Sequence, residues 1–159
     1  MKHPLLLFII VITCILFSAH PADAQKKKKR KAQLETVVTT AKSYIGTPYQ
    51  YGGSSRKGID CSGLIHNSYK AAGISIPRTA KQQAKYGKSQ GWGDVREGDV
   101  VTFKFKEKGE KWWHAGLVTQ VSKDKILFVH ASSSRGVVES DLMSDYYHSN
   151  VKRIQRIIK

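Results

Sequence analysis

The spacing of apolar residues changes once along this chain, and that change limits the folds that the chain can adopt. Between Glu35 and Tyr86 the apolar side chains recur with helical spacing, in segments that Gly46, Gly73 and Gly87 close. From residue 100 onward apolar and polar residues alternate, which predicts β-strands. Helices followed by an antiparallel sheet predict an α+β fold, with the N-terminal helices packed on the sheet.

The boundaries of the expected elements follow from the same pattern. Helices are predicted over residues 35–45, 62–72 and 80–86, and a loop rich in Gly and Ser covers residues 47–59. Strands are predicted over residues 100–105, 113–121, 125–131, 137–139 and 151–157. Because only residues 122–124 separate the second and third of these strands, we expect the two to form a hairpin.

The N-terminus has the three parts of a secretory signal peptide. Lys2 provides a positive charge, Leu5–Phe17 is an apolar run, and Ala22-Asp23-Ala24 fits a cleavage site. A run of about 13 residues is shorter than the roughly 20 that span a bilayer, which favours cleavage over a retained anchor. The sequence therefore predicts a signal peptide over residues 1–24 and export to the cell envelope, either the periplasm or the extracellular side.

A run of basic residues, Lys26–Lys31, follows this segment and contributes to a net charge of +15. Dense like charges repel each other, so the sequence predicts a disordered arm over residues 25–33. Such an arm would attract anionic polymers of the envelope. Charge alone also suggests binding to nucleic acid, but export and the lack of a reader motif argue against any specific nucleic-acid partner.

The chain has two cysteines, of which Cys14 lies in the predicted signal peptide. A lipid anchor on Cys14 is not expected, because Val11-Ile12-Thr13 precede it where a small residue would be needed. Cys61 is then a lone thiol in an exported chain, where thiols tend to be oxidised. An unpaired cysteine in that setting indicates either intermolecular pairing or a reactive thiol.

Cys61 lies where the Gly-rich loop meets an apolar helix, in Asp60-Cys61-Ser62-Gly63. The unpaired N–H groups and the dipole of a helix N-terminus favour a thiolate, and we expect a lowered pKa for Cys61. A thiolate attacks carbonyl carbon, and the same N–H groups could stabilise the oxyanion that forms. The alternative is a buried cysteine with a structural role.

A cysteine nucleophile needs a base and a group that orients the base. His114 and His130 fall in the two strands of the predicted hairpin, so pairing brings them close together. His66 lies one turn along the helix of Cys61, and His148 lies in a polar stretch, so both are expected to be packing or surface residues. The alternative is that His114 and His130 are core histidines. No metal or other cofactor is expected, because no spacing of Cys and His indicates a zinc site.

These residues together resemble the NlpC/P60 family of cell-wall cysteine peptidases. The order and spacing agree along nearly the whole of residues 46–132. The motifs that carry the resemblance are Gly46-Thr47-Pro48-Tyr49-Gln50-Tyr51-Gly52-Gly53, Asp60-Cys61-Ser62-Gly63-Leu64, Gly73-Ile74-Ser75-Ile76-Pro77-Arg78-Thr79-Ala80-Lys81-Gln82-Gln83, Glu97-Gly98-Asp99-Val100-Val101, His114-Ala115-Gly116-Leu117-Val118 and Val129-His130-Ala131-Ser132.

The resemblance implies a papain-like catalytic domain over residues 34–159. We expect the domain to be a monomer, although no feature of the sequence specifies the oligomeric state. It implies that Cys61 is the nucleophile, His114 the general base, and His130 the polar group that orients His114. The further residues that match substrate-binding positions of the family are Tyr49, Asp60 and Ser62.

The implied reaction is hydrolysis of peptidoglycan stem peptides at the bond between D-γ-glutamate and the diamino acid. Two alternatives stay open, namely hydrolysis of the D-alanyl–diamino acid cross-link, and acyl transfer or amidase chemistry through the same Cys–His site. The sequence leaves open whether the diamino acid is diaminopimelate or lysine.

Overall fold

The computed structural model of the protein describes residues 21–107 and 110–159. The predicted signal peptide, except Pro21–Ala24, and Cys14 lie outside the described residues. The helices are α2 (Pro21–Ser43), α3 (Cys61–Ala71), α4 (Ala80–Gln83) and α5 (Asp145–His148), with one 3-10 turn, η1 (Trp92–Asp94). The strands are β1 (Ser54–Ser55), β2 (Gly58–Ile59), β3 (Lys88–Gln90), β4 (Val100–Glu107), β5 (Glu110–Val121), β6 (Ile126–Ser132), β7 (Gly136–Asp141) and β8 (Val151–Arg156).

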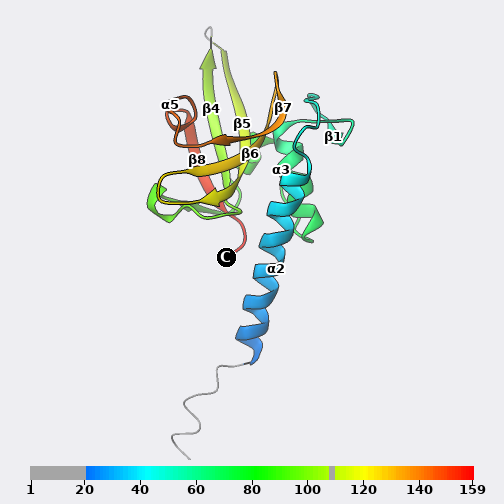
Figure 1. Ribbon diagram of the computed structural model, residues 1–159, viewed down its shortest axis with the longest axis vertical. Coiled ribbons are helices and arrows are strands. Elements are labelled where there is room, and N and C mark those ends of the chain that lie inside the picture. The colour runs from blue at the N-terminus through cyan, green and yellow to red at the C-terminus, as the bar shows by residue number, and fades with distance from the viewer. Residues whose placement is uncertain (1–20, 108–109) are drawn as a thin grey trace, which may run out of the picture. The chain divides into compact units, whose positions relative to one another are not determined.

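A six-stranded sheet forms the centre of the domain, with the strand order β3-β8-β4-β5-β6-β7. Every neighbouring pair in it is antiparallel. The strands β4 and β5 form a long hairpin that continues beyond β6, as Figure 1 shows. The predicted α+β class and the predicted β5–β6 hairpin are therefore confirmed.

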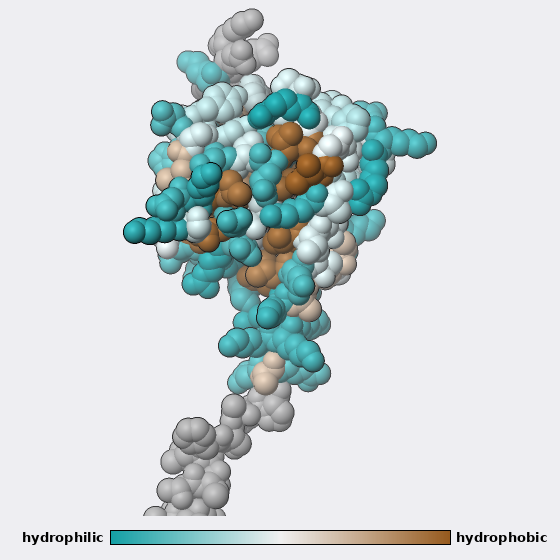
Figure 2. Space-filling model, viewed as in Figure 1, coloured by the Kyte–Doolittle hydropathy of each residue, from teal (hydrophilic) through white to brown (hydrophobic). Residues whose placement is uncertain are grey.

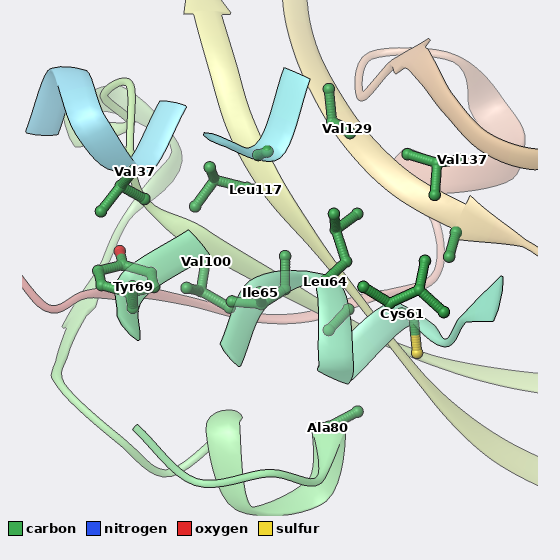
Figure 3. Packing of buried hydrophobic residues seen from close by; sticks show 14 of the residues in the cluster. Val37, Cys61, Leu64, Ile65, Tyr69, Ala80, Val100, Leu117, Val129 and Val137 are labelled. Carbon is green, nitrogen blue, oxygen red and sulfur yellow. The ribbon is translucent and has the colours of Figure 1, made fainter. Parts of the chain in front are cut away.

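Both faces of the sheet carry buried apolar side chains, because neighbouring residues of a strand point to opposite faces. On one face Val100, Leu117 and Val129 pack with Leu64 and Ile65 of α3 (Figure 3). Val37 and Ala41, which lie near the end of α2, belong to the same buried cluster. On the other face a second cluster packs separately, and it consists of Val95, Val101, Phe103, Phe105, Val118, Phe128, Leu142 and Ile154. The apolar residues of the predicted strands therefore pack into two separate cores, one on each face of the sheet.

The N-terminal basic run differs from its prediction. The sequence predicted a disordered arm over residues 25–33, whereas the structure continues α2 through these residues. Lys, Arg, Ala and Gln are good helix formers, which offsets part of the repulsion between like charges. The side chains of Gln25–Lys31 are exposed. Gln33–Lys159 form one compact unit, to which the described residues before Gln33 do not belong.

The surface of the protein reflects the excess of basic residues. The face drawn in Figure 2 carries many hydrophilic residues, with hydrophobic ones gathered in patches between them. Within residues 21–107 and 110–159, no helix combines the length and the apolar character that crossing a membrane would require.

Several short elements were not predicted. The strands β1, β2 and β3 have two or three residues each, and α5 has four. Such lengths hold too few residues for a periodic pattern to show. The predicted helix over residues 80–86 is also shorter in the structure, where α4 ends at Gln83.

Candidate active site

Cys61 is the first residue of α3, and its place there is set by Asp60. The Asp60 backbone is extended, and its carboxylate accepts a hydrogen bond of 2.6 Å from the N–H of Gly63, which caps the helix. Gly63 is needed at this position, because a Cβ there would lie 2.6 Å from the carbonyl oxygen of Gly53. Cys61 is a free cysteine with 8% of its surface exposed. Figure 3 shows it at one end of α3, at the margin of the buried cluster.

Backbone N–H groups act on the sulfur of Cys61. Those of Ala115, Ser62 and Cys61 itself each oppose the rise in the pKa of the thiol. The N–H of Ala115 is available because the pairing between β5 and β6 runs from Val121↔Ile126 only as far as Gly116↔His130. The splitting of these two strands therefore leaves a donor from the middle of the sheet facing the thiol.

His114 and His130 lie on the two strands beside this split and contact each other directly. Nε2 of His114 and Nδ1 of His130 are 2.9 Å apart, in a buried hydrogen bond. On its other side, Nε2 of His130 lies 3.0 Å from Oγ of Ser140 and 3.2 Å from Oη of Tyr147. The hydrogen bonds form a chain that begins at β5 and reaches β7 and α5.

This chain engages Nε2 of His114 with His130 and leaves Nδ1 as the second ring nitrogen of His114. For Nδ1 to accept a proton, a neutral His114 must carry its own proton on Nε2 and donate it to Nδ1 of His130. His130 in turn donates from Nε2 to Ser140 or Tyr147, so each member of the chain has a consistent role.

Burial shifts the ionisation of all three groups toward their neutral forms. Desolvation raises the pKa of Cys61 to about 11, an effect that the N–H of Ala115 opposes and the charge of Asp60 increases. Desolvation lowers the pKa of His114 to about 4. For His130, desolvation and then the neighbouring His114 and Arg135 lower the pKa to about 3. The sequence argument for a lowered thiol pKa is therefore wrong for the resting protein, because burial outweighs the donors at the helix N-terminus.

Asp60 also belongs to a cluster with Ser62 and Arg78. The guanidinium of Arg78 spans the carboxylate of Asp60, with distances of 2.8 Å and 2.9 Å to its two oxygens. The same guanidinium donates to Oγ of Ser62 at 2.9 Å and to the carbonyl of Gly53 at 2.9 Å. Burial alone would raise the pKa of Asp60, but the hydrogen bonds and charge of Arg78 hold this pKa below its usual range.

Two cavities meet at Cys61. One, of about 450 Å³, is lined by His114, His130 and Arg135, and we name it the Arg135 cavity. The other, of about 490 Å³, is lined by Asp60, Ser62 and Arg78, and we name it the Arg78 cavity. The residues that line both cavities are Tyr49, Cys61, Trp112 and Trp113. The thiol thus lies where the two cavities adjoin, and we call the two cavities together the groove.

The structure brings together the residues that the sequence singled out. Cys61, His114 and His130 line one cavity, and Tyr49, Asp60 and Ser62 line the neighbouring one. Burial raises the pKa of Tyr49, as do the nearby Cys61 and Asp60. His66 instead bonds to the carbonyl of Ile76, and His148 is exposed and stacks on Trp92, as expected of packing and surface residues.

Other residues of the groove were not predicted to belong to the site. Ser140, Tyr147 and Arg135 have no spacing relation to Cys61 in the sequence, and no local pattern marks them. Arg78 is part of a motif that resembles the family, which was the one available signal. Within the described residues, no cluster of three or more Cys, His, Asp or Glu side chains could hold a metal ion.

Comparison with known proteins gives a consistent picture. The model of the NlpC/P60 family matches residues 46–156. A probable endopeptidase NlpC of Escherichia coli is 32% identical over 157 residues, which cover 94% of this chain and 97% of that protein. A γ-D-glutamyl-L-lysine dipeptidyl-peptidase of Bacillus subtilis is 38% identical over 96 residues, 60% of this chain and 32% of that protein.

A solved structure resembles this chain in three dimensions as well. The structure of the peptidoglycan hydrolase RipB of Mycobacterium tuberculosis superposes with a TM-score of 0.65 at 25% identity, and the match covers 83% of this chain and 68% of that one.

Proposed function

Because this chain belongs to the NlpC/P60 family, we propose that it is a cysteine peptidase that hydrolyses the peptide stems of peptidoglycan. The observation that carries the proposal is that Cys61 and His114 line one cavity, with the N–H of Ala115 at the sulfur. The two relatives and the solved structure described above support the substrate class, because their names specify an endopeptidase, a peptidase of a γ-D-glutamyl-L-lysine bond and a peptidoglycan hydrolase.

The reaction would begin from a neutral thiol and a neutral imidazole. As the sulfur of Cys61 attacks the carbonyl carbon, its proton passes to Nδ1 of His114. The carbonyl oxygen becomes an oxyanion, which backbone N–H groups near the sulfur are available to stabilise. The charge that His114 acquires is stabilised by its hydrogen bond to His130, so His130 acts as the orienting group.

The second half of the reaction returns the proton. His114 gives the proton to the nitrogen of the leaving amine, the C–N bond breaks, and a thioester remains on Cys61. Water then attacks the thioester while His114 accepts its proton, and the free thiol and a carboxylate are formed. Resolution by an amine in place of water would give acyl transfer, which remains the alternative reaction of the same site.

We propose that the scissile bond is the one between D-γ-glutamate and the diamino acid. The alternative is the D-alanyl–diamino acid cross-link. The assignment follows from the resemblance of the motifs, and the B. subtilis relative has a name that specifies this bond. In this proposal Tyr49, Asp60 and Ser62 contact the stem peptide on the acyl side of Cys61.

The N-terminal sequence indicates where the enzyme would act. Residues 1–24 would direct export to the envelope, and the basic residues at the start of α2 would attract anionic polymers there. The domain would act as a monomer and would need no cofactor.

The test is digestion of purified peptidoglycan and of defined stem peptides by the wild-type protein and by Cys61→Ala. We expect the wild type to release fragments and Cys61→Ala to release none, while circular dichroism and thermal unfolding show that the variant stays folded. Mass spectrometry of the products identifies the bond, and an amide in place of a new carboxylate would indicate transfer. Undiminished cleavage by a folded Cys61→Ala variant would refute the proposal.

A further inference from the structure

We propose that Arg135, at the turn between β6 and β7, binds a carboxylate on the leaving-group side of the substrate. This inference rests on the proposed function and assigns a specificity to the same site. It names the chemical feature, a carboxylate on the diamino acid or just beyond it, that distinguishes good substrates from poor ones.

The chemistry of the reaction decides which cavity receives the leaving group. His114 must reach the nitrogen of the leaving amine in order to protonate it, so the leaving group lies on the same side of Cys61 as the imidazole. His114 lines the Arg135 cavity and is not among the residues that line the Arg78 cavity. The leaving group therefore occupies the Arg135 cavity.

The charges of this cavity are not balanced. Arg135 lines it, and none of the other described side chains that line it is acidic. By contrast Arg78 and Arg156 each form an ion pair, with Asp60 and Asp99 respectively. Among the side chains that the structure describes, no carboxylate forms an ion pair with Arg135. A guanidinium is well suited to bind a carboxylate through two parallel hydrogen bonds.

The surroundings of Arg135 also fit a polar ligand. Ser132, Ser133 and Ser134 line the same cavity and present hydroxyl groups that can donate to a carboxylate oxygen. Arg135 is close enough to His130 for its charge to disfavour a second positive charge on that ring. A carboxylate seated on Arg135 would cancel this effect while it holds the leaving group beside the two imidazoles.

The backbone that carries Arg135 is held in place. Gly136, the next residue, has a φ of +70°, and a Cβ on it would lie 2.5 Å from the carbonyl oxygen of Thr47. Two backbone hydrogen bonds of 2.9 Å then join Val137 to Gly46 and Thr47. The turn is therefore anchored to the loop that leads to Tyr49, and Arg135 has a fixed starting point from which to reach a ligand.

The experiment uses tripeptides of L-alanine, γ-linked D-glutamate and a diamino acid. The diamino acid is lysine or diaminopimelate, and each carboxyl group on it is supplied either free or as the carboxamide. We expect the wild type to cleave the peptide with a free carboxylate with a kcat/KM about tenfold higher than its carboxamide, the effect of one charge-assisted contact. The peptide pair that shows the preference identifies which carboxylate is bound, either the α-carboxylate or the side-chain carboxylate of diaminopimelate.

The variants are Arg135→Gln, Arg135→Lys and, as a matched control, Arg153→Gln. Arg153 lies on β8 in a separate cavity, so its loss changes the net charge equally but leaves the groove intact. We expect Arg135→Gln to lose the preference for the carboxylate, with Arg135→Lys intermediate and Arg153→Gln unchanged. If Arg135→Gln reduces cleavage of carboxylate and carboxamide by the same factor, or of neither, the inference is overturned.

Binding provides a readout that does not depend on cleavage. Calorimetric titration of Cys61→Ala with the same peptides measures the preference in the absence of turnover, and the double variant Cys61→Ala/Arg135→Gln should lack it. If the wild type cleaves no peptide, the proposed function fails, while a preference that depends on Arg135 in this titration would still support the carboxylate site. Equal binding of both forms to Cys61→Ala would refute the site.

Discussion

The Arg78 cavity and the Arg135 cavity meet at one thiol, but they pair their charges in opposite ways. In the Arg78 cavity the guanidinium of Arg78 donates to the carboxylate of Asp60, to Oγ of Ser62 and to the carbonyl of Gly53. In the Arg135 cavity two neutral imidazoles are buried beside an arginine for which the described side chains offer no acidic partner. The ion pair of Arg78 is complete before any ligand arrives, although the exposed Lys81 also lines that cavity, whereas Arg135 has no acidic partner among the described side chains.

This difference fits two separate tasks, the positioning of the substrate in one cavity and proton transfer in the other. A fully bonded cluster keeps its shape, so the Arg78 cavity can position the acyl part of a substrate and the start of α3. Neutral imidazoles can accept and return a proton without first losing one to solvent, which suits the side where the proposed reaction would make and break bonds. The comparison predicts different responses of the two sides to mutation and to pH.

The largest expected effect is on the catalytic side, from His114→Gln. Removing a general base typically costs 10²–10⁴-fold in rate, so we expect kcat to fall roughly 10³-fold. The unfolding free energy should change far less, because Gln can still donate a hydrogen bond toward His130. Steady-state kinetics on defined stem peptides, with urea unfolding as the control, measure both. A variant that retains more than about a tenth of wild-type kcat would show that His114 is not the base.

The second effect is a loss of stability at acidic pH, and it occurs in a different pH range for each of the two cavities. The folded pKa values of His114 and His130, about 4 and about 3, lie below the ordinary histidine value of 6.5. Below about pH 6.5 these two histidines bind protons in the unfolded chain but stay neutral in the folded chain. The stability that is present at pH 7 is therefore lost as the pH falls toward 4. Each imidazole can contribute up to about 3 kcal/mol to this loss.

Asp60 should respond in a lower window. Its pKa is held below the usual 3.8, so the stability it contributes is present above about pH 4 and is lost as the pH falls further. Urea unfolding of Cys61→Ala at pH 7, 5.5, 4 and 3 measures both windows. Adding His114→Gln and His130→Gln should flatten the curve between pH 6.5 and 4, whereas below pH 4 the loss that Asp60 contributes should remain after the part due to His130 is gone. An unchanged slope between pH 6.5 and 4 in that variant would contradict the burial of neutral imidazoles.

The third effect lies in the Arg78 cavity, from Asp60→Ala. The change removes the cap of α3 and leaves Arg78 without its carboxylate, so we expect about 2 kcal/mol of lost stability. Asp60→Asn keeps an acceptor for the N–H of Gly63 and should recover part of this loss. Thermal and urea unfolding provide the measurement. If both variants unfold like the wild type, the cluster contributes nothing to the stability of this side.

The smallest effect concerns the far end of the imidazole chain. Ser140→Ala and Tyr147→Phe each remove one of the two oxygens near Nε2 of His130, and the remaining one can still accept the proton. We expect each single variant to reduce kcat no more than about fivefold, in line with a net hydrogen bond of about 1 kcal/mol. The double variant should reduce it by more than the product of the two single effects. Simple multiplication of the single effects would show that the two oxygens do not substitute for each other.

Sequence alone predicted those parts of the molecule whose signals are local. The change from helical to period-two spacing predicted α3 and the strands β4 to β6, because periodicity records which face of an element is buried. The hairpin around residues 122–124 predicted the meeting of His114 and His130, because a short turn leaves little freedom in pairing. The basic run was misjudged, since its helix propensity was weighed too little against its charge.

The identity of Cys61 as the residue at the start of a helix was thus determined by the sequence, together with the fold class and the histidine pair. Tertiary structure alone decided the ionisation of these groups, because desolvation depends on everything that packs around a side chain. It also decided that Asp60 faces Arg78 and that Arg135 has no described acidic partner, because the chain brings such residues together only when the whole sheet and its loops are assembled.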